Sequence, residues 1–333
     1  MSTISWGILG TARIATEKVI PPMQATTHCR VEAIASRDAS RARTAASELG
    51  IPKAFGSYED LLADPDIEAV YIPLPNDMHV AWATAAAEAG KHVLCEKPIA
   101  LDASGAAQLL AVRDRTGVRI QEAFMVHTHP QWVRARDLVR DGDIGRLQAV
   151  QGFFSYHNDN PRDIRNVKAQ GGGGMLDIGC YPIKTGRFVT GLEPTRVASV
   201  MEWDPGSGID RLGSVILDFG GVQATFTYGT QLVPHQRMEF FGDRGRLTVE
   251  IPFNAPPDRP TRLYLDDGSA LGGRNARTVE IETCDQYGVE ADEFSRAILE
   301  NAEPPIPLED AVANMRVIDA AFRAAASGTW ERP

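Results

Sequence analysis

The chain has 333 residues, 43% of them hydrophobic, which at roughly 150 residues per domain predicts two folded domains rather than a disordered chain. Its 34 Lys and Arg residues face 44 Asp and Glu residues, a net charge of −10 that argues against nucleic acid or an anionic membrane as a partner. No stretch reaches the ~18 apolar residues of a membrane span, and no basic signal segment opens the chain. Four widely spaced cysteines are typical of reduced thiols, so we expect a cytoplasmic protein without bound metal.

Strands and helices alternate through the first half of the chain. We expect strands at 4–9, 31–35, 69–72, 92–95 and 118–121, and helices at 14–20, 38–49, 80–89 and 103–116. Asp102 is placed to cap the last of these helices, and Gly117 to end it. Alternation at this spacing predicts βαβ units, a parallel sheet and helices on both of its faces.

The second half has a different pattern, with runs rich in β-branched and aromatic residues. We expect strands at 149–155, 197–203, 213–219, 223–230, 237–241 and 246–251, and closing helices at 289–300 and 308–327. Short Gly and Asp turns between several runs predict antiparallel pairing. The expected domains are therefore residues 1–124 and 125–333. An alternative in which the C-terminal helix packs back on the first domain remains open.

The turn after the first strand carries the first site signal. Aligned to G-x-G-x-x-G, it has Gly10, Ala12 and Ala15, so only the glycine of the tight turn is kept. The helix that follows would offer N–H groups and a positive dipole end to a diphosphate. The candidate cofactor-binding residues here are Gly10, Thr11, Ala12, Arg13 and Ile14. An ordinary tight βα turn is the alternative.

The end of the second strand bears on the choice of cofactor. An NAD site places an acidic residue there, whereas this chain has Ser36 and Arg37, with Arg41 one turn later. Guanidinium groups suit a 2′-phosphate, so we expect NADP to be preferred, with NAD as the alternative cofactor. The other interpretation is that both arginines are solvated and that Asp38 is a plain helix cap.

Three further segments are specific enough to suggest a family. Residues 71–79 read YIPLPNDMH, residues 95–101 read CEKPIAL, and Gly171–Gly174 leads into MLDIGCY at 175–181. Together they resemble the Gfo/Idh/MocA (glucose–fructose oxidoreductase / inositol dehydrogenase) superfamily. The branch most similar to this chain holds dimeric dihydrodiol dehydrogenases and NADP-dependent aldose 1-dehydrogenases. The resemblance implies an α/β plus α+β protein: an N-terminal Rossmann doubly wound parallel sheet, and a C-terminal domain with a large, mostly antiparallel, open-faced sheet.

The resemblance also implies roles for individual residues. Lys97, Asp177 and Tyr181 would be catalytic; Pro75, Asn76, His79 and Glu96 would join Lys97 at the cofactor; and His127 and Arg165 would join the catalytic three at the substrate. The peptide bond before Pro98 would plausibly be cis. The spacing His127-Thr128-His129 is that of a strand with both imidazoles on one face, but no other metal ligand stands nearby.

The four-residue spacing of Asp177 and Tyr181 indicates how the two side chains would be arranged. Four residues apart on a helix, both side chains would address one substrate, although Pro182 could delay the start of the helix until Tyr181. A phenol with a pKa near 10 needs a cationic neighbour to act as an acid/base near neutral pH, and the resemblance supplies Lys97 for this role. An ordinary half-buried tyrosine and a helix-capping aspartate are the alternatives.

Together these observations predict an NADP-dependent oxidoreductase that transfers a hydride between the nicotinamide and a hydroxyl or carbonyl carbon of a sugar, polyol or dihydrodiol. Two alternatives remain: an NAD-dependent enzyme of another class on the same fold, such as a glycoside hydrolase acting through transient oxidation, or a non-catalytic NADP-sensing regulator. A sheet with one uncovered face would need a partner surface, so we expect a homodimer or homotetramer formed through it.

Overall fold

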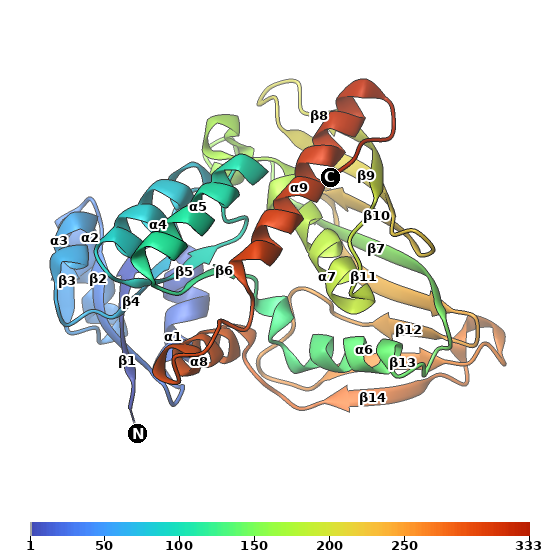
Figure 1. Cartoon of the computed structure of the whole chain (residues 1–333), viewed down its shortest axis with the longest axis horizontal. Helices are drawn as coiled ribbons and strands as arrows, with labels where there is room; N and C mark the ends of the chain where they lie inside the picture. Colours follow the sequence, from blue (N-terminus) through green and yellow to red (C-terminus); the bar gives the residue numbers. More distant parts are fainter. Residues whose placement is uncertain (1) are drawn as a thin grey trace. The chain divides into compact units, whose positions relative to one another are not determined.

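The computed structural model describes residues 2–333, which form two compact units (Figure 1). The first unit holds the chain up to Thr128 together with Asp285–Val312, and the second holds His129–Cys284 and Ala313–Pro333. The chain therefore divides differently from the expected split at residue 124, because a segment near the C-terminus returns to the first unit.

A six-stranded parallel sheet is the centre of the first unit. Its strands are β1 (Ile4–Leu9), β2 (Cys29–Ala35), β3 (Lys53–Phe55), β4 (Ala69–Ile72), β5 (His92–Glu96) and β6 (Ile120–Ala123). Their order, β3-β2-β1-β4-β5-β6, is that of a dinucleotide-binding doubly wound sheet. The parallel sheet is confirmed, whereas the short strand β3 was not predicted. Strands β1 and β4 are buried at every position, which explains their continuous apolar sequence.

Helices connect these strands and have clear capping signals. They are α1 (Ile20–Gln24), α2 (Ala39–Leu49), α3 (Tyr58–Ala63), α4 (His79–Glu88) and α5 (Ala103–Thr116). Asp102 accepts a hydrogen bond from the backbone N–H of Gly105 at 2.7 Å, and Gly117 ends α5 in the left-handed conformation, so both predicted caps are confirmed. A π-helical turn, η1 (Ala15–Val19), precedes Pro21, whose missing N–H cannot continue an α-helical ladder.

The segment that returns to the first unit is helix α8 (Gln286–Leu299), which packs on β1. The indole N–H of Trp6 donates a 3.0 Å hydrogen bond to Ser295 Oγ, and the Trp6 ring lies 5.9 Å from that of Phe294. These groups are fully buried. The first unit therefore closes its core with residues that are almost 300 positions from β1 in the chain.

An eight-stranded sheet forms the second unit. Its strands are β7 (Leu147–His157), β8 (Arg196–Trp203), β9 (Asp210–Asp218), β10 (Gln223–Gly229), β11 (Gln231–Gly242), β12 (Arg246–Val249), β13 (Thr261–Asp266) and β14 (Arg277–Ile281). The strands lie in the order β14-β13-β12-β11-β7-β10-β9-β8. All neighbouring strands are antiparallel except β7 and β10, which are parallel. The mostly antiparallel sheet is thus confirmed, whereas the polar strands β13 and β14 were not predicted.

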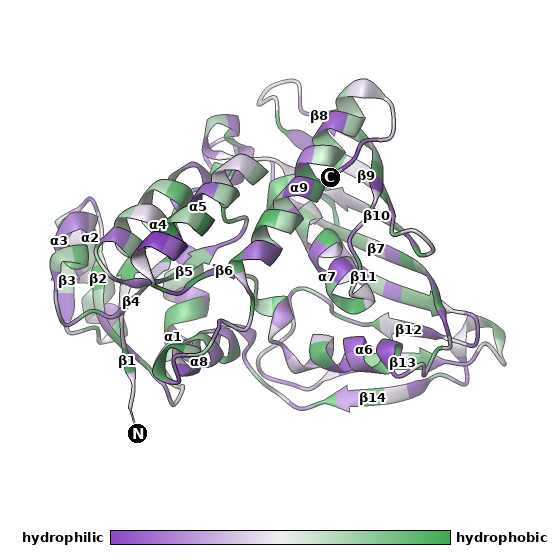
Figure 2. Cartoon of the chain, viewed as in Figure 1, coloured by the Kyte–Doolittle hydropathy of each residue, from purple (hydrophilic) through white to green (hydrophobic). Residues whose placement is uncertain are grey.

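Helices cover one face of this sheet. They are α6 (Pro130–Arg140), α7 (Cys180–Thr190) and α9 (Leu308–Ser327). Helix α6 alternates between hydrophobic and hydrophilic residues along its length (Figure 2), and its buried residues include Trp132, Ala135 and Val139, which share one face. On the other face of the sheet, Val200 and Ile216 are 69% and 42% exposed. The sheet is therefore open on one side within this unit.

Candidate active site

The C-terminal ends of the parallel strands in the first unit carry the predicted cofactor residues. Gly10 follows β1, Ser36 and Arg37 follow β2, Asn76 follows β4, and Lys97 follows β5. Because all these strands are parallel, their ends lie along one edge of the sheet. Ligands of open α/β sheets bind at this edge, next to the point where the strand order reverses. Here that point lies between β1 and β4.

The turn after β1 needs the glycine that it has. Gly10 has a φ angle of +123°, and a Cβ there would lie 3.1 Å from Leu74 Cδ2. The side chains of Thr11 and Ala12 are half-buried, and Arg13 points outward to pair with Glu17 at 2.9 Å. The first helical turn therefore presents its backbone end at the sheet edge without a bulky side chain across it, which fits a diphosphate.

A tyrosine that was not predicted joins the arginines after β2. Tyr58, the first residue of α3, lies close enough to Arg37 and Arg41 to feel their charges, and its hydroxyl lies 3.9 Å from the position of a Gly10 Cβ. Burial raises the pKa of Tyr58, while the nearby charges of Arg37 and Arg41 act to lower it. A tyrosine directly after a third short strand is the signal that could have indicated this residue.

Asp38 also caps the helix that follows β2, as the alternative interpretation of this segment expected. Asp38 caps α2 through the backbone N–H of Ser40 at 2.8 Å, and Ser36 Oγ accepts from the Asp38 N–H at 3.2 Å. Arg37 and Arg41 have exposed side chains. The cap orders the turn, and the arginines remain on the surface beside Gly10.

The Glu96–Pro98 segment is held on both sides of Lys97. Glu96 accepts a 2.6 Å hydrogen bond from the Tyr71 hydroxyl and a 3.2 Å one from the Lys97 backbone N–H. The Lys97–Pro98 bond is cis, and the Ile99 N–H donates to the buried Glu122 at 3.0 Å. Lys97 is half-buried and directly follows β5, so these bonds fix its backbone at the edge of the sheet.

His79 occupies a supporting position below this edge. It is fully buried, and its ring nitrogens lie 2.8 Å from the carbonyl oxygens of Leu74 and Pro98. Burial lowers its pKa. The ring therefore ties the loop after β4, which carries Pro75 and Asn76, to the loop that carries Lys97, and both its nitrogens are already engaged.

The two histidines after β6 do not share a strand. Residues Met125–His127 form a 3-10 turn, η3, and His129 caps α6 by accepting from the Gln131 N–H at 3.0 Å. The strand-like spacing was therefore the wrong interpretation. His127 Nε2 lies 4.0 Å from Asp310, and burial lowers the pKa of His129 to about 4. His129 is thus a structural residue of the second unit.

Asp177 and Tyr181 lie on one continuous helical stretch of the second unit. Met175–Gly179 is a π-helical turn, η6, that runs directly into α7, and Pro182 stands in the first turn of α7. Since Pro182 has no N–H, the wider turn before it accommodates the lost hydrogen bond. The helical stretch therefore begins before Tyr181. Asp177 and Tyr181 are both in helical conformation, which the expectation from their four-residue spacing required.

Both side chains also face the same side of strand β7. The Tyr156 hydroxyl donates a 2.5 Å hydrogen bond to Asp177, and the Tyr181 ring packs edge-on at 5.6 Å against Phe154. Phe154 and Tyr156 are two residues apart on one strand, so they lie on one face. Tyr181 is 7% exposed. The structure thus brings the carboxylate and the phenol together on one face of the sheet.

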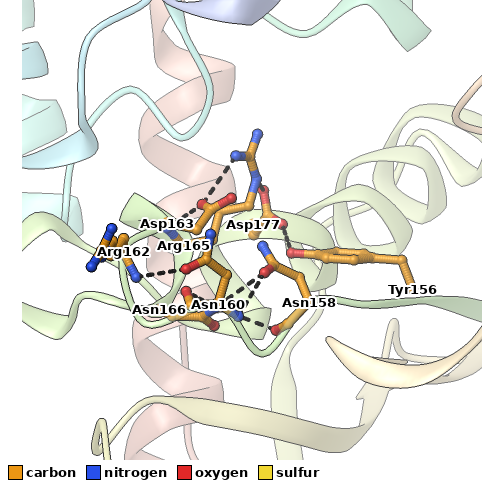
Figure 3. A network of polar contacts seen from close by, with 8 residues as sticks. All are labelled: Tyr156, Asn158, Asn160, Arg162, Asp163, Arg165, Asn166 and Asp177. Atoms are coloured by element: carbon orange, nitrogen blue, oxygen red, sulfur yellow. Dashed lines mark hydrogen bonds and ion pairs between the residues drawn. The ribbon is translucent and has the colours of Figure 1, made fainter.

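Figure 3 shows the Asp177 carboxylate between the hydroxyl of Tyr156 and the guanidinium of Arg165. Arg165 Nε lies 3.3 Å from one Asp177 oxygen, and Arg165 also pairs with Asp163 at 3.3 Å, while its side chain stays 45% exposed. Burial and the Asp177 charge raise the pKa of Tyr156 far above its usual range, which keeps the phenol protonated as a donor. Asp177 is therefore positioned as an acceptor between a phenol and a guanidinium group.

The loop that carries Arg165 has its own anchors. The Asn166 side-chain amide donates to the Asn160 carbonyl at 2.9 Å and to the Asn158 carbonyl at 3.3 Å. Asp163 caps the following 3-10 turn, η4 (Ile164–Asn166), at the Arg165 N–H. These bonds order the loop around Arg165 without help from a ligand (Figure 3).

Two other kinds of feature are absent from the part of the chain that the structure describes. Within residues 2–333, no three His, Cys, Asp or Glu side chains are grouped closely enough to hold a metal ion. None of the helices in this range combines the length and the apolar composition needed to cross a membrane.

Comparisons with known proteins agree with this architecture. Residues 4–124 match the model of an oxidoreductase family with an NAD-binding Rossmann fold, and residues 132–248 match the GFO/IDH/MocA C-terminal domain. An uncharacterised oxidoreductase from Rhizobium meliloti is 49% identical over 99% of both chains. A D-xylose 1-dehydrogenase (NADP(+)) from Haloferax volcanii is 38% identical over 97% of this chain and 98% of its own. The crystal structure of a 3-ketoreductase from Actinomadura kijaniata, in complex with NADP and TDP-benzene, matches with a TM-score of 0.90 at 31% identity, over 97% of this chain and 98% of that one.

Proposed function

Because this chain belongs to the Gfo/Idh/MocA family of oxidoreductases with an NAD-binding Rossmann fold, we propose that it is an NADP-dependent dehydrogenase or reductase of sugars, polyols or dihydrodiols. Relatives named for xylose oxidation, for 3-keto-sugar reduction and for dihydrodiol oxidation support this range of substrates. The observation that carries the proposal is the placement of Asp177 and Tyr181 on one face of β7, with Asp177 held as an acceptor.

The cofactor part of the proposal concerns the edge of the first sheet. Ser36, Arg37, Arg41 and Tyr58 would hold the 2′-phosphate, and the helical turn after Gly10 would hold the diphosphate. Glu96, Pro75 and Asn76 would border the nicotinamide end. When bound, the nicotinamide supplies the acceptor or donor of a hydride.

The chain's own residues would control the proton. Tyr181 Oη takes the proton of the substrate hydroxyl during oxidation and returns it during reduction. Lys97, directly after β5 in the first unit, would be the cation that stabilises developing negative charge on an oxygen. Asp177, with Tyr156 and Arg165 as its donors, accepts a hydrogen bond from a neighbouring substrate hydroxyl and so orients the ring. His127 and Arg165 would complete the substrate contacts.

The test is turnover with a panel of aldoses, polyols and diols, followed by absorbance of the reduced cofactor. Tyr181→Phe should lower kcat by at least ~100-fold, the usual contribution of a general acid/base. Lys97→Ala should lower kcat while the affinity for NADP stays within about threefold. Tyr264→Phe is the matched control, because Tyr264 donates to Glu250 on an exposed strand. Full activity of Tyr181→Phe, or no oxidation or reduction of any panel member, would refute the proposal.

We also propose that the protein works as a homodimer or homotetramer in the cytoplasm. The uncovered face of the eight-stranded sheet carries Val200 and Ile216 in exposed positions and is the surface proposed to pair. All four cysteines are free thiols, which suits a reducing compartment.

A further inference from the structure

The glycine-rich segment before Asp177 surrounds two buried side chains of the neighbouring strands. Gly173 has a φ angle of +133°, and a Cβ there would overlap the carboxylate of Asp210 at the start of β9. A Cβ on Gly174 would lie 2.7 Å from the ring of Tyr228 on β10, and one on Gly179 would lie 3.0 Å from the same ring. The glycines therefore make room for Asp210 and Tyr228.

Asp210 caps the turn that carries Asp177. Asp210 is only 2% exposed. Its Oδ2 atom accepts two hydrogen bonds, one from the backbone N–H of Met175 at 2.6 Å and one from the hydroxyl of Tyr228 at 2.6 Å. Met175 is the first residue of the π-helical turn, and Asp177 is the third. The carboxylate thus fixes the start of the turn two residues before the proposed acceptor.

The surroundings make the charge of Asp210 sensitive to pH. Burial, with a smaller contribution from the Asp177 charge, raises the pKa of Asp210 to about 6, against the opposing effect of its bonds to Tyr228 and Met175. The titratable groups that face it are Tyr228 from β10 and Asp177 from the turn itself. Burial and the Asp210 charge raise the pKa of Tyr228 well above its usual range, so Tyr228 remains a donor throughout.

We propose that Asp210, together with Tyr228, is a positioning residue whose ionised carboxylate holds the Met175–Gly179 turn, and hence Asp177, in its working orientation. Both donors point at one oxygen, and a carboxyl group that has taken up a proton is a weaker acceptor. Loss of the charge therefore loosens the turn. This inference rests on the proposed function only through the role of Asp177.

The kinetic test compares pH profiles of kcat/KM. In the wild type we expect activity to fall below about pH 6, as Asp210 becomes protonated. Asp210→Asn should have activity about 10-fold lower above pH 6, the size of one lost charge-assisted hydrogen bond, and should lack this acidic limb. Tyr228→Phe should keep the limb but shift it to higher pH, because the carboxylate loses a donor. Asp204→Asn removes a carboxylate that accepts from the N–H groups of Gly206 and Ser207 and from Gln231, none of which bonds Asp210, and should leave the profile unchanged.

A second measurement does not depend on turnover. Amide hydrogen exchange of the peptide 171–181, corrected for the intrinsic pH dependence, should accelerate below about pH 6 in the wild type and in Asp204→Asn, and should be independent of pH in Asp210→Asn. If Asp210→Asn does not fold, Tyr228→Phe replaces it, and the pH at which its exchange accelerates should lie above that of the wild type, because Asp210 loses a donor. Identical exchange in wild type and variants would overturn this inference even if the enzyme is an active oxidoreductase. Conversely, pH-dependent exchange in a protein without turnover would support Asp210 as the cap while refuting the proposed function.

Discussion

Asp177 takes its orientation from two side chains that come from different segments, Tyr156 on β7 and Arg165 on the loop after it. Tyr156→Phe removes the hydroxyl and leaves the ring. We expect kcat/KM to fall about 10-fold or more, since a hydrogen bond to a charged group contributes about 1.5–3 kcal/mol. Steady-state kinetics measures this loss, and an unchanged thermal midpoint shows that the fold is intact. Activity equal to that of the Tyr264→Phe control would show that Asp177 does not need this donor.

The side chains after β2 decide between the two dinucleotides. Arg37→Leu removes the guanidinium that lies near Tyr58. The affinity for NADP should fall at least 10-fold, and that for NAD should change by less than about twofold, because only NADP carries a 2′-phosphate. Titration calorimetry with both cofactors measures the two affinities. Arg43→Leu, on the exposed side of α2, is the matched control. Equal losses for both cofactors would place Arg37 away from the 2′-phosphate.

Sequence reasoning identified site residues where a strand end specifies them. Gly10, Arg37 and Lys97 follow strands of a parallel sheet, so their common edge follows from the alternation of strands and helices alone. Tyr58 and Tyr156 were not predicted, because their importance comes from partners that lie 21 positions away in each case, Arg37 and Asp177. A contact of this kind has no periodic pattern in the sequence.

Among the elements, α8 shows how a distant segment completes a domain. Ser295 on α8 accepts the indole N–H of Trp6 on β1 in a fully buried site. Ser295→Ala leaves that donor without its partner, so the free energy of unfolding should fall by about 1–3 kcal/mol. Urea denaturation measures the change, with the exposed Ser327→Ala as the control. A loss no larger than in the control would mean that α8 contributes through apolar packing alone.

The same element explains where sequence reasoning about the fold stopped. The periodicity of 289–300 predicted a helix, and a helix is present at Gln286–Leu299, but periodicity does not say which core a helix joins. Strand β14 was missed because it is a short and mostly exposed strand at the edge of the sheet, and its neighbour β13 was missed because its six residues include the charged Arg262 and Asp266. The two π-helical turns share a recognisable signal, a proline two or three residues after each turn.

At the scale of the whole molecule, the open face of the eight-stranded sheet is large enough to form an interface between two copies of the chain. Cross-strand partners place Val200 opposite Ser214 and Ile216 opposite Thr225, all on this face. Eight strands at ~4.8 Å spacing give a width of about 34 Å. The strands have four to twelve residues, about eight on average, which gives a mean length of about 25 Å, so the face offers on the order of 800 Å² per partner. That area is the size of a stable dimer interface.

A lysine in this face would bring two like charges together across a symmetric interface without a partner for either. Ile216→Lys should therefore convert the oligomer into a particle of 36.2 kDa, measured by sedimentation velocity at micromolar concentration. Leu271→Lys makes the same change at a 97% exposed residue outside the eight strands and should leave the oligomer intact. A monomeric wild type, or a variant with the wild-type mass, would rule out assembly through this face. Since Asp177 and Tyr181 pack on the opposite, covered face, loss of the oligomer should leave their geometry in place, and any fall in kcat of the monomer would measure how far pairing stiffens the sheet beneath them.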